Sequence, residues 1–253
     1  MAWDPNLYLI FEKYRRQPAI DLLAHINLER PNVVFDLGCG PGNVTALLIE
    51  RWPCANITGV DSSSEMLTKA AEIYPGIAWS KQDISEFAAT DVDLIFSNAA
   101  FNWVPNHARL IASLAGFLGE AGILAIQMPR NYEQPSHAQI VDCIESRSSR
   151  HHLRQFVDFT HVQPPAFYHD VLAPLVRNVE IWETNYFHVL QGDDPVLEWV
   201  MGTALRPVVD ALSGSEKRDF VEEMRQRYRD AYPRRPDGTT LFAMQRLFIV
   251  AQR

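Results

Sequence analysis

The sequence predicts an α/β fold in which a seven-stranded sheet carries helices on both faces, with helical insertions near one edge. The first half of the chain alternates short β-branched runs with helix-like segments, which is typical of a parallel sheet. A glycine-rich turn follows the first of these runs, and the alternation stops after Pro129. The length of 253 residues suits one well-packed domain. We therefore expect a single domain over residues 1–253.

Five strands are expected in the first half, each a short apolar run bounded by turn residues. They cover residues 32–37, 57–61, 77–81, 93–98 and 123–128. The helices expected between them cover residues 43–51, 64–74 and 107–118. Ser62 or Ser63 is available as the N-cap of the second of these helices.

The second half of the chain lacks this alternation of strand-like and helix-like segments. Residues 130–174 are polar and rich in histidine and arginine, so we expect inserted helices and loops there. An alternating pattern predicts a long strand over 179–190, and 241–252 supplies the last strand. The chain then has two helical insertions, 130–175 and 192–240, near the carboxyl edge of the sheet. Open α/β sheets bind their ligands at that edge.

The second insertion is expected to be helical over 196–232. Pro207 breaks this helical pattern, because proline removes a backbone donor. The helix is expected to restart after Ser213, with Ser215 as the cap of a segment that runs from Glu216 onward.

The central signal is the turn Asp36-Leu-Gly-Cys-Gly-Pro-Gly42, directly after the first strand. Glycines in this place allow a tight turn and a close approach of the backbone to a ligand. A dinucleotide fingerprint requires a further glycine where this chain has Asn43, and Pro41 excludes a P-loop. The Asp36 carboxylate repels a pyrophosphate but attracts an ammonium group. The turn therefore favours a positively charged amino-acid nucleoside.

Further polar residues follow the later strands. Asp61 ends the second strand, where a carboxylate accepts hydrogen bonds from both hydroxyls of an adenosine ribose. Asp83 follows the third strand and is placed to accept from an adenine amine, with Ile84 against the ring. Taken singly, Asp36 also fits a helix cap or a buried ion pair, and Asp83 fits the start of a turn. The ordered set of acids at successive strand ends favours a nucleoside site.

The composition limits the partners and the location. Hydrophobic residues make up 47% and charged residues 21%, a globular balance. The formal net charge of −8 argues against a nucleic-acid partner, which requires a basic surface. Cys39, Cys54 and Cys143 match no disulfide framework, and no signal peptide or membrane-spanning run is visible. We expect a cytoplasmic protein without a membrane or nucleic-acid partner.

The three motifs resemble those of class I S-adenosylmethionine methyltransferases. They are Asp36-Leu-Gly-Cys-Gly-Pro-Gly42, Gly59-Val-Asp61 and Gln82-Asp-Ile84. The resemblance implies a Rossmann-like sheet, S-adenosyl-L-methionine as cofactor, and a residue at the end of the fourth strand beside the reacting methyl group. The cofactor-binding residues that it implies are Asp36, Gly38, Cys39, Gly40, Gly42, Asp61, Ser62, Met66, Asp83, Ile84, Asn98 and Trp103.

A closer resemblance, to the trans-aconitate 2-methyltransferase family, runs nearly end to end. The matching stretches include Trp3-Asp-Pro-Asn-Leu-Tyr-Leu9, Trp103-Val-Pro105, Gln127-Met-Pro129, Leu205-Arg-Pro207 and Arg246-Leu-Phe-Ile-Val-Ala251. The chain departs from the family pattern at Ala204, at Gln17 and over residues 146–165. The resemblance implies esterification of one carboxylate of trans-aconitate, a small tricarboxylate, under a lid formed by the insertions.

A tricarboxylate acceptor requires cationic and hydrogen-bonding side chains, and arginine binds planar carboxylates in a bidentate manner. The candidate substrate-binding residues are Arg206, Tyr8, Arg15, Arg130, Tyr186 and His188. Two other roles remain open at this point. Arg206, which precedes Pro207, also fits a helix cap, and His188 also fits the packed face of its strand.

The chemistry requires no general base, because a carboxylate with a pKa of about 4 is already ionised at neutral pH. Alignment alone can lower the barrier by roughly 7–11 kcal/mol. We therefore expect no catalytic residue beyond those that position the substrates, and no metal. The alternatives are methylation of another small acid or thioester, a non-catalytic protein that binds S-adenosylmethionine, and an NAD-dependent oxidoreductase. Asp36 and Asn43 argue against the last.

Overall fold

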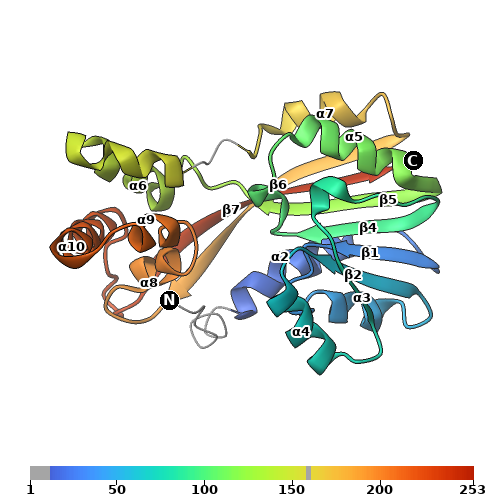
Figure 1. Ribbon diagram of the computed structural model, residues 1–253, viewed down its shortest axis with the longest axis horizontal. Coiled ribbons are helices and arrows are strands. Elements are labelled where there is room, and N and C mark those ends of the chain that lie inside the picture. Colours follow the sequence, from blue (N-terminus) through green and yellow to red (C-terminus); the bar gives the residue numbers. More distant parts are fainter. Residues whose placement is uncertain (1–11, 158–160) are drawn as a thin grey trace. The chain divides into compact units, whose positions relative to one another are not determined.

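The protein contains one seven-stranded sheet with the strand order β3-β2-β1-β4-β5-β7-β6 (Figure 1). The structure is a computed structural model that describes residues 12–157 and 161–253. β1 to β5 pair in parallel, whereas β7 is antiparallel to β5. The predicted seven-stranded α/β fold is confirmed. The strands are β1 (Val33–Leu37), β2 (Asn56–Asp61), β3 (Ala78–Lys81), β4 (Val92–Asn98), β5 (Leu118–Pro129), β6 (Asn178–Leu190) and β7 (Thr240–Gln252).

Helices connect the strands and cover the sheet. α3 and α4 pack against β2, while α5 packs against β5 and α7. Right-handed crossovers that run in opposite directions from β1 and from β4 place these two groups on opposite faces. The helices are α2 (Glu12–Ala24), α3 (Thr45–Arg51), α4 (Ser64–Ile73), α5 (His107–Phe117), α6 (Pro135–Glu145), α7 (Pro165–Leu172), α8 (Pro195–Met201), α9 (Arg206–Asp210) and α10 (Gly214–Ala231). Short 3-10 helices are η1 (Ile84–Glu86), η2 (Phe101–Trp103) and η3 (Ser148–Phe156).

The central strands β4 and β5 are buried on both faces. Leu94, Ile95 and Phe96 of β4 have no exposed surface, and neither do the middle residues of β5. Strands covered on both sides consist of near-continuous apolar runs, and each large buried side chain contributes about 1.5–3 kcal/mol. Ser97 interrupts the run in β4, and its hydroxyl donates to the Leu37 carbonyl at 2.7 Å. This hydrogen bond fixes the end of β4 against the end of β1.

The chain forms two compact units, which we call the sheet unit and the helical unit. Of the described residues, the sheet unit comprises 15–129, 161–184 and 246–253. The helical unit comprises 12–14, 130–157 and 185–245. β6 and β7 contribute residues to both. That the whole chain acts as one domain with insertions at 130–175 and 192–240 stays a prediction.

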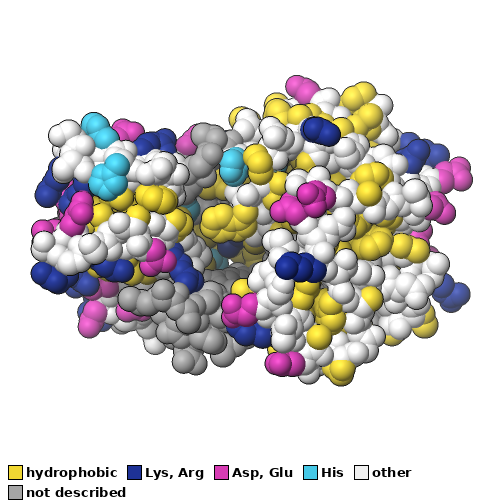
Figure 2. All heavy atoms as spheres, viewed as in Figure 1, with side chains coloured by type: hydrophobic (Ala, Val, Ile, Leu, Met, Phe, Trp, Pro, Cys, Tyr) yellow, Lys and Arg dark blue, Asp and Glu magenta, His cyan; other side chains and the backbone are white. Residues whose placement is uncertain are grey.

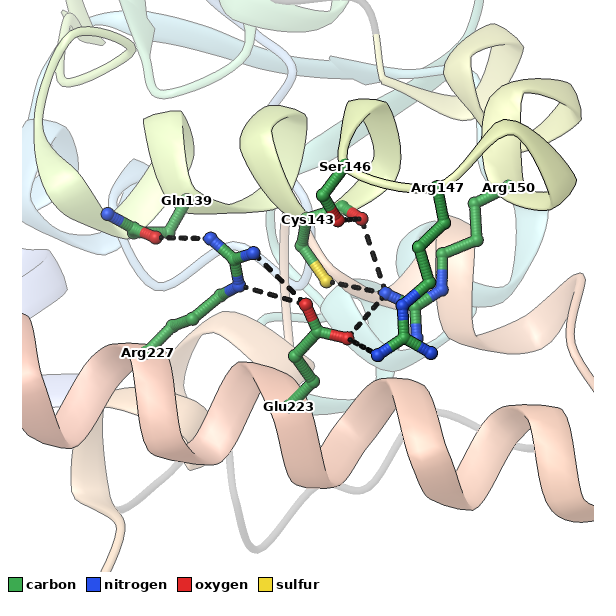
Figure 3. Close-up of polar contacts among 7 residues, drawn as sticks. All are labelled: Gln139, Cys143, Ser146, Arg147, Arg150, Glu223 and Arg227. Carbon is green, nitrogen blue, oxygen red and sulfur yellow. Dashed lines mark hydrogen bonds and ion pairs between the residues drawn. The ribbon is translucent and has the colours of Figure 1, made fainter.

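A cluster of ionic contacts around Glu223 stabilises the helical unit (Figure 3). Glu223 of α10 accepts from Arg150 at 2.8 Å, from Arg147 at 3.1 Å and from Arg227 at 3.0 Å. Burial raises the pKa of Glu223, but the hydrogen bonds from Arg150 and Arg227 outweigh it and leave the pKa below its usual value. Arg150 also donates to the Cys143 sulfur at 3.1 Å. The cluster therefore joins α6, η3 and α10.

The two helix caps expected from the sequence have different outcomes. Ser63 caps α4, since its hydroxyl accepts from the Met66 amide at 3.3 Å, which confirms that prediction. The prediction that Ser215 caps the helix now labelled α10 is wrong. α10 begins at Gly214 after the extended backbone of Ser213, so Ser215 lies inside the first turn.

α2 has no counterpart among the helices expected from the sequence. Its apolar residues show no helical periodicity, and Pro18 lies inside it. Tertiary contacts fix the end of this helix instead. The Arg51 guanidinium donates to the Leu23 and Ile26 carbonyls, the latter at 2.7 Å. The first of these carbonyls belongs to the last turn of α2, where carbonyls have no partner within the helix, and the second follows that turn.

Candidate functional site

The glycine turn leaves the carboxyl end of β1 and is held against β2. The amides of Gly38 and Cys39 donate to the Val60 carbonyl at 2.7 and 3.1 Å. Gly38 has a φ of +75° and Gly40 a φ of +55°, values that favour glycine. A Cβ on Gly38 would lie 2.2 Å from the Ala100 Cβ, whereas no described atom lies within 4 Å of the Cβ position of Gly40. The turn is thus closely packed at Gly38 and open at Gly40.

Asp36 lies just before this turn and is 1% exposed. Its pKa is raised to about 7, chiefly by burial, and the neighbouring Asp61 contributes to the rise. The Thr45 hydroxyl opposes this effect by donating to Asp36 Oδ2 at 2.6 Å. The carboxylate therefore changes charge near neutral pH and lies in a site that stabilises a neighbouring cation. Thr45 was not among the residues expected from the sequence. The only sign of its role there is its place at the start of the helix that follows the glycine turn.

Asp61, at the end of β2, is connected to the glycine turn. Its Oδ2 accepts from the Gly40 amide at 2.9 Å, and its Oδ1 accepts from the Ser63 amide at 2.8 Å. A carboxylate offers about four acceptor positions, so Asp61 keeps the capacity to accept further hydrogen bonds. Ser62 is exposed and Met66 is half-buried.

Asp83 caps η1. Its Oδ1 accepts from the amide and the hydroxyl of Ser85 at 2.8 and 2.6 Å, and these bonds lower the pKa of Asp83. Ile84 is 8% exposed, and its Cδ1 lies 3.4 Å from the Cβ position of Gly38. Asp83 thus starts a turn, which agrees with one of its two interpretations from the sequence. Ile84 packs directly against the glycine turn.

A tryptophan that the sequence analysis missed supports the same turn. Trp79 of β3 lies so close to two glycines that a Cβ would approach its ring to 2.3 Å at Gly59 and 2.8 Å at Gly42. Its indole nitrogen donates to the Tyr74 carbonyl at 3.3 Å. Cys39 is 6% exposed in this packed region, and burial raises the pKa of its thiol far above the usual value.

The end of β4 leads into η2. Asn98 ends the strand with its Oδ1 buried. Phe101 has no exposed surface, and its carbonyl accepts from His107 Nε2 at 2.9 Å, so it anchors the segment. His107 Nδ1 in turn contacts the Tyr168 hydroxyl at 2.8 Å. Trp103, by contrast, is 64% exposed.

The strand register places several of these residues on one face of the sheet. Asp36 pairs with Gly59 on one side and with Phe96 on the other. Alternate residues of a strand share a face, so Asp61 and Asn98 share that face with Asp36. The cofactor-binding residues implied by the sequence are therefore all in the sheet unit, at the ends of adjacent strands and in the segments that follow them.

The candidate substrate-binding residues are distributed differently. His188 is 4% exposed, and its ring lies 4.4 Å from that of Tyr14 and 5.2 Å from that of Trp199. It is therefore a packed aromatic residue of the helical unit. This agrees with the interpretation that His188 belongs to the packed face of its strand. Tyr186, its neighbour on the same face, lies 6.4 Å from it, ring to ring.

Two of the arginine candidates, Arg130 and Arg206, are half-buried. Arg206 is the first residue of α9 and forms an ion pair with Asp210 at 3.5 Å. Arg130 follows β5 and its amide donates to the Gln245 carbonyl at 3.0 Å. Arg15 belongs to α2, in the sheet unit. Tyr8 lies outside the described residues.

None of the helices within residues 12–157 and 161–253 is long and apolar enough to cross a membrane. Over the same residues, no group of three or more His, Cys, Asp and Glu side chains is arranged to hold a metal ion.

Comparison with known proteins identifies the class that this fold and site define. A family model described as a methyltransferase domain matches residues 34–122, from β1 into β5. A putative methyltransferase from Bacillus halodurans C-125 has a similar structure, with a TM-score of 0.59, 12% identity, and coverage of 93% of this chain and 98% of that one. Phosphoethanolamine N-methyltransferase 2 from Haemonchus contortus, solved with S-adenosyl-L-methionine, is similar with a TM-score of 0.56 and 14% identity, over 93% of this chain and 52% of that one. The fold is that of the methyltransferases.

Curated relatives identify the family within that class. The trans-aconitate 2-methyltransferase of Azoarcus sp. (strain BH72) is 44% identical over 100% of this chain and 99% of that protein. The trans-aconitate 2-methyltransferase of Rhodopseudomonas palustris (strain BisB18) is 43% identical over 98% of both. The chain belongs to the trans-aconitate 2-methyltransferase family, which confirms the resemblance seen in the sequence.

Proposed function

We propose that this protein transfers the methyl group of S-adenosyl-L-methionine to a carboxylate of trans-aconitate and forms the monomethyl ester. The observation that carries this proposal is the likeness over the whole chain, at 41–44% identity, to curated trans-aconitate 2-methyltransferases. A likeness of this extent includes both the cofactor motifs and the segments outside them. The acids at the ends of β1 and β2 support the same donor.

The donor is an amino-acid nucleoside with a positively charged sulfonium. Asp36 lies where its carboxylate attracts the ammonium group, and the open backbone at Gly40 allows the ligand to approach closely. Asp61 retains acceptor positions for the two ribose hydroxyls. Cys39, Ser62, Met66, Ile84 and the other residues named for the cofactor complete the proposed donor site.

The reaction is an in-line displacement at the methyl carbon. A carboxylate oxygen of the acceptor forms the new C–O bond while the C–S bond breaks, and the electron pair stays on sulfur. No proton moves, so the products are the ester and the neutral thioether. The protein contributes by aligning the two substrates and by removing water from the attacking oxygen, without a general base.

We propose that Arg206 binds a carboxylate of the acceptor, with Arg130, Arg15, Tyr8, Tyr186 and His188 as further candidates. The Arg206 side chain is 34% exposed, and its contact with Asp210 is long at 3.5 Å. Exposed ion pairs of this kind contribute at most about 1 kcal/mol, so an acceptor carboxylate can compete with Asp210 for the guanidinium.

The cytoplasmic location and the lack of a nucleic-acid partner belong to the same proposal. They rest on the cysteine content and on the net charge of −8. Figure 2 shows acidic and basic side chains interspersed on the face that it draws, a distribution that suits a small-molecule enzyme.

A substrate panel with radiolabelled donor tests the proposal. We expect transfer to trans-aconitate to exceed transfer to citrate, an isopropylmalate-like acid and a malonyl thioester by at least tenfold in kcat/KM. Equal rates on all acids would overturn the assignment of the acceptor. Donor binding without transfer to any acid would favour a non-catalytic protein, and NADH binding without donor binding would favour an oxidoreductase.

A pair of variants tests the donor site. Asp61→Asn is expected to weaken donor binding at least tenfold, because a hydrogen bond to a charged acceptor contributes about 1.5–3 kcal/mol. Asp170→Asn, at an exposed aspartate of α7, is the matched control and should leave the affinity unchanged. Calorimetry measures both, and equal affinities for the two variants would remove Asp61 from the site.

A further inference from the structure

A row of polar side chains continues along the sheet beyond the proposed donor site. Asn98 of β4 pairs with Gln127 of β5, and Gln127 pairs with Phe248 of β7. Pro129 and Arg246 form another pair of the same ladder. Paired residues share a face, as do alternate residues of one strand. Asn98, Gln127 and Arg246 therefore lie on one face, which is also the face of Asp36 and Asp61.

Gln127 is an unusual residue for its position. It has no exposed surface, and it interrupts a strand whose neighbouring residues Ile126 and Met128 are apolar and buried. Neither its Nε2 nor its Oε1 has a hydrogen-bond partner within the described part of the chain. More than nine in ten buried polar groups in proteins are paired, and each unpaired one costs about 1–3 kcal/mol. A buried amide with two unpaired atoms therefore indicates a ligand.

The surroundings of Gln127 indicate which ligand. On one side lies Asn98, whose buried Oδ1 also lacks a partner among the described residues. On the other side Phe248 pairs with Gln127, and Arg246, a cation that is 6% exposed, lies two residues away along β7 on the same face. A buried guanidinium beside an amide donor suits a planar anion, and a carboxylate accepts from both. The position next to Asn98, at the end of β4, is where the proposed function requires the acceptor.

We propose that Gln127 binds the acceptor carboxylate that receives the methyl group, and that Arg246 binds a second carboxylate of the same molecule. This inference rests on the proposed function and adds to it the residues that orient the acid. The neutral Gln127 amide donates from Nε2 to one carboxylate oxygen and leaves the other oxygen free to attack. A neutral amide withdraws less electron density from the carboxylate than a guanidinium would, so the free carboxylate oxygen stays nucleophilic.

The stacked rings of His25, Trp182 and Phe248 limit this part of the face. The Trp182 ring lies 4.8 Å from that of Phe248, nearly parallel to it, and 4.0 Å from that of His25. Since Phe248 is the pairing partner of Gln127, an apolar wall lies directly beside the amide. Such a wall excludes water from the attacking oxygen, and it strengthens the hydrogen bonds of the amide.

The variant Gln127→Met tests the inference, because it keeps the shape of the side chain and removes both polar atoms. We expect the KM for trans-aconitate to rise at least tenfold and the donor affinity to stay within twofold. The ligand-free variant should be as stable as the wild type or more stable, since it buries no unpaired amide. The matched control is Gln252→Met, at the opposite end of β7, where Gln252 pairs with Ile123. It should change none of these quantities.

Gln127→Glu provides an independent test, since a carboxylate at this position repels the acceptor. We expect an even larger rise in KM, which grows as the pH is raised and the new carboxylate ionises. If both Gln127 variants use trans-aconitate as well as Gln252→Met does, the inference is overturned while the proposed function stands. If the wild type transfers methyl groups to no acid, the proposed function fails and this inference fails with it.

Discussion

At the scale of single residues, the charge of Asp36 results from three opposing effects. Burial and the nearby Asp61 raise its pKa, the Thr45 hydroxyl lowers it, and the resulting pKa is about 7. A carboxylate in bulk water would be ionised throughout the physiological range. In this site the Asp36 carboxyl is only half-ionised at a pH of about 7, and a bound cation favours its ionised form.

The affinity for the donor should therefore depend on pH. Only the ionised Asp36 attracts the ammonium group, and the ionised fraction rises as the pH rises through about 7. We expect the donor to bind about eightfold more tightly at pH 7.5 than at pH 6, in proportion to that fraction. Calorimetry over this range measures the effect.

Thr45→Val provides the control for this prediction. It removes the hydrogen bond that favours the ionised carboxylate, so the midpoint of the pH dependence should move upward. A flat profile in the wild type, or a downward shift in the variant, would contradict the electrostatic role given to Asp36.

Residue-scale features differ in how well the sequence predicts them. Asp36 and Asp61 are identified by their place relative to the glycine turn, since strand ends meet at one edge of a parallel sheet. Thr45, Trp79 and Gln127 acquire their roles from contacts across the fold. Of these three, only Gln127 gives a signal, as a polar residue inside an apolar strand.

At the scale of elements, the glycine turn shows two different reasons for glycine. Gly38 faces the Ala100 side chain, so even a methyl group has no room, whereas Gly40 faces open space. Both also have positive φ values, which cost a residue with a Cβ about 1–2 kcal/mol. The first glycine is thus required for packing, whereas the open space at the second suits the proposed approach of a ligand.

Alanine at the two positions should separate these reasons. Gly38→Ala adds a clash to the backbone strain, so we expect it to lower the free energy of unfolding by about 2–5 kcal/mol. Gly40→Ala should cost about 1–2 kcal/mol but weaken donor binding at least tenfold. Denaturant unfolding and calorimetry measure the two effects. Equal losses of stability, or an unchanged donor affinity in Gly40→Ala, would contradict this division.

The elements of the sheet were predictable because period-2 and buried patterns are local properties of the sequence. Two features of the helices were not predictable in this way. α2 has no apolar periodicity and depends on the Arg51 guanidinium at its end. The start of α10 was misplaced because two serines flank Gly214 and the extended backbone of Ser213 decides between them. Local propensity does not include these tertiary contacts.

At the scale of the whole molecule, binding of the donor should appear as added stability of the fold. A ligand at 100 times its dissociation constant stabilises the native state by about 2.7 kcal/mol. For a chain of this size that corresponds to a rise in Tm of about 5–10 °C. Calorimetric melting with and without S-adenosyl-L-methionine measures this shift. The Asp61→Asn variant should show a smaller shift at the same donor concentration, and an equal shift would contradict the proposed site.

The three thiols give this molecule a built-in set of chemical reporters. Cys54 is exposed, whereas Cys39 is buried in the sheet unit and Cys143 in the helical unit. A thiol-reactive dye will therefore modify Cys54 at once in the native protein and reach the other two sulfurs only through local opening. The labelling rate of each buried sulfur then measures how often its own unit opens, without any engineered substitution.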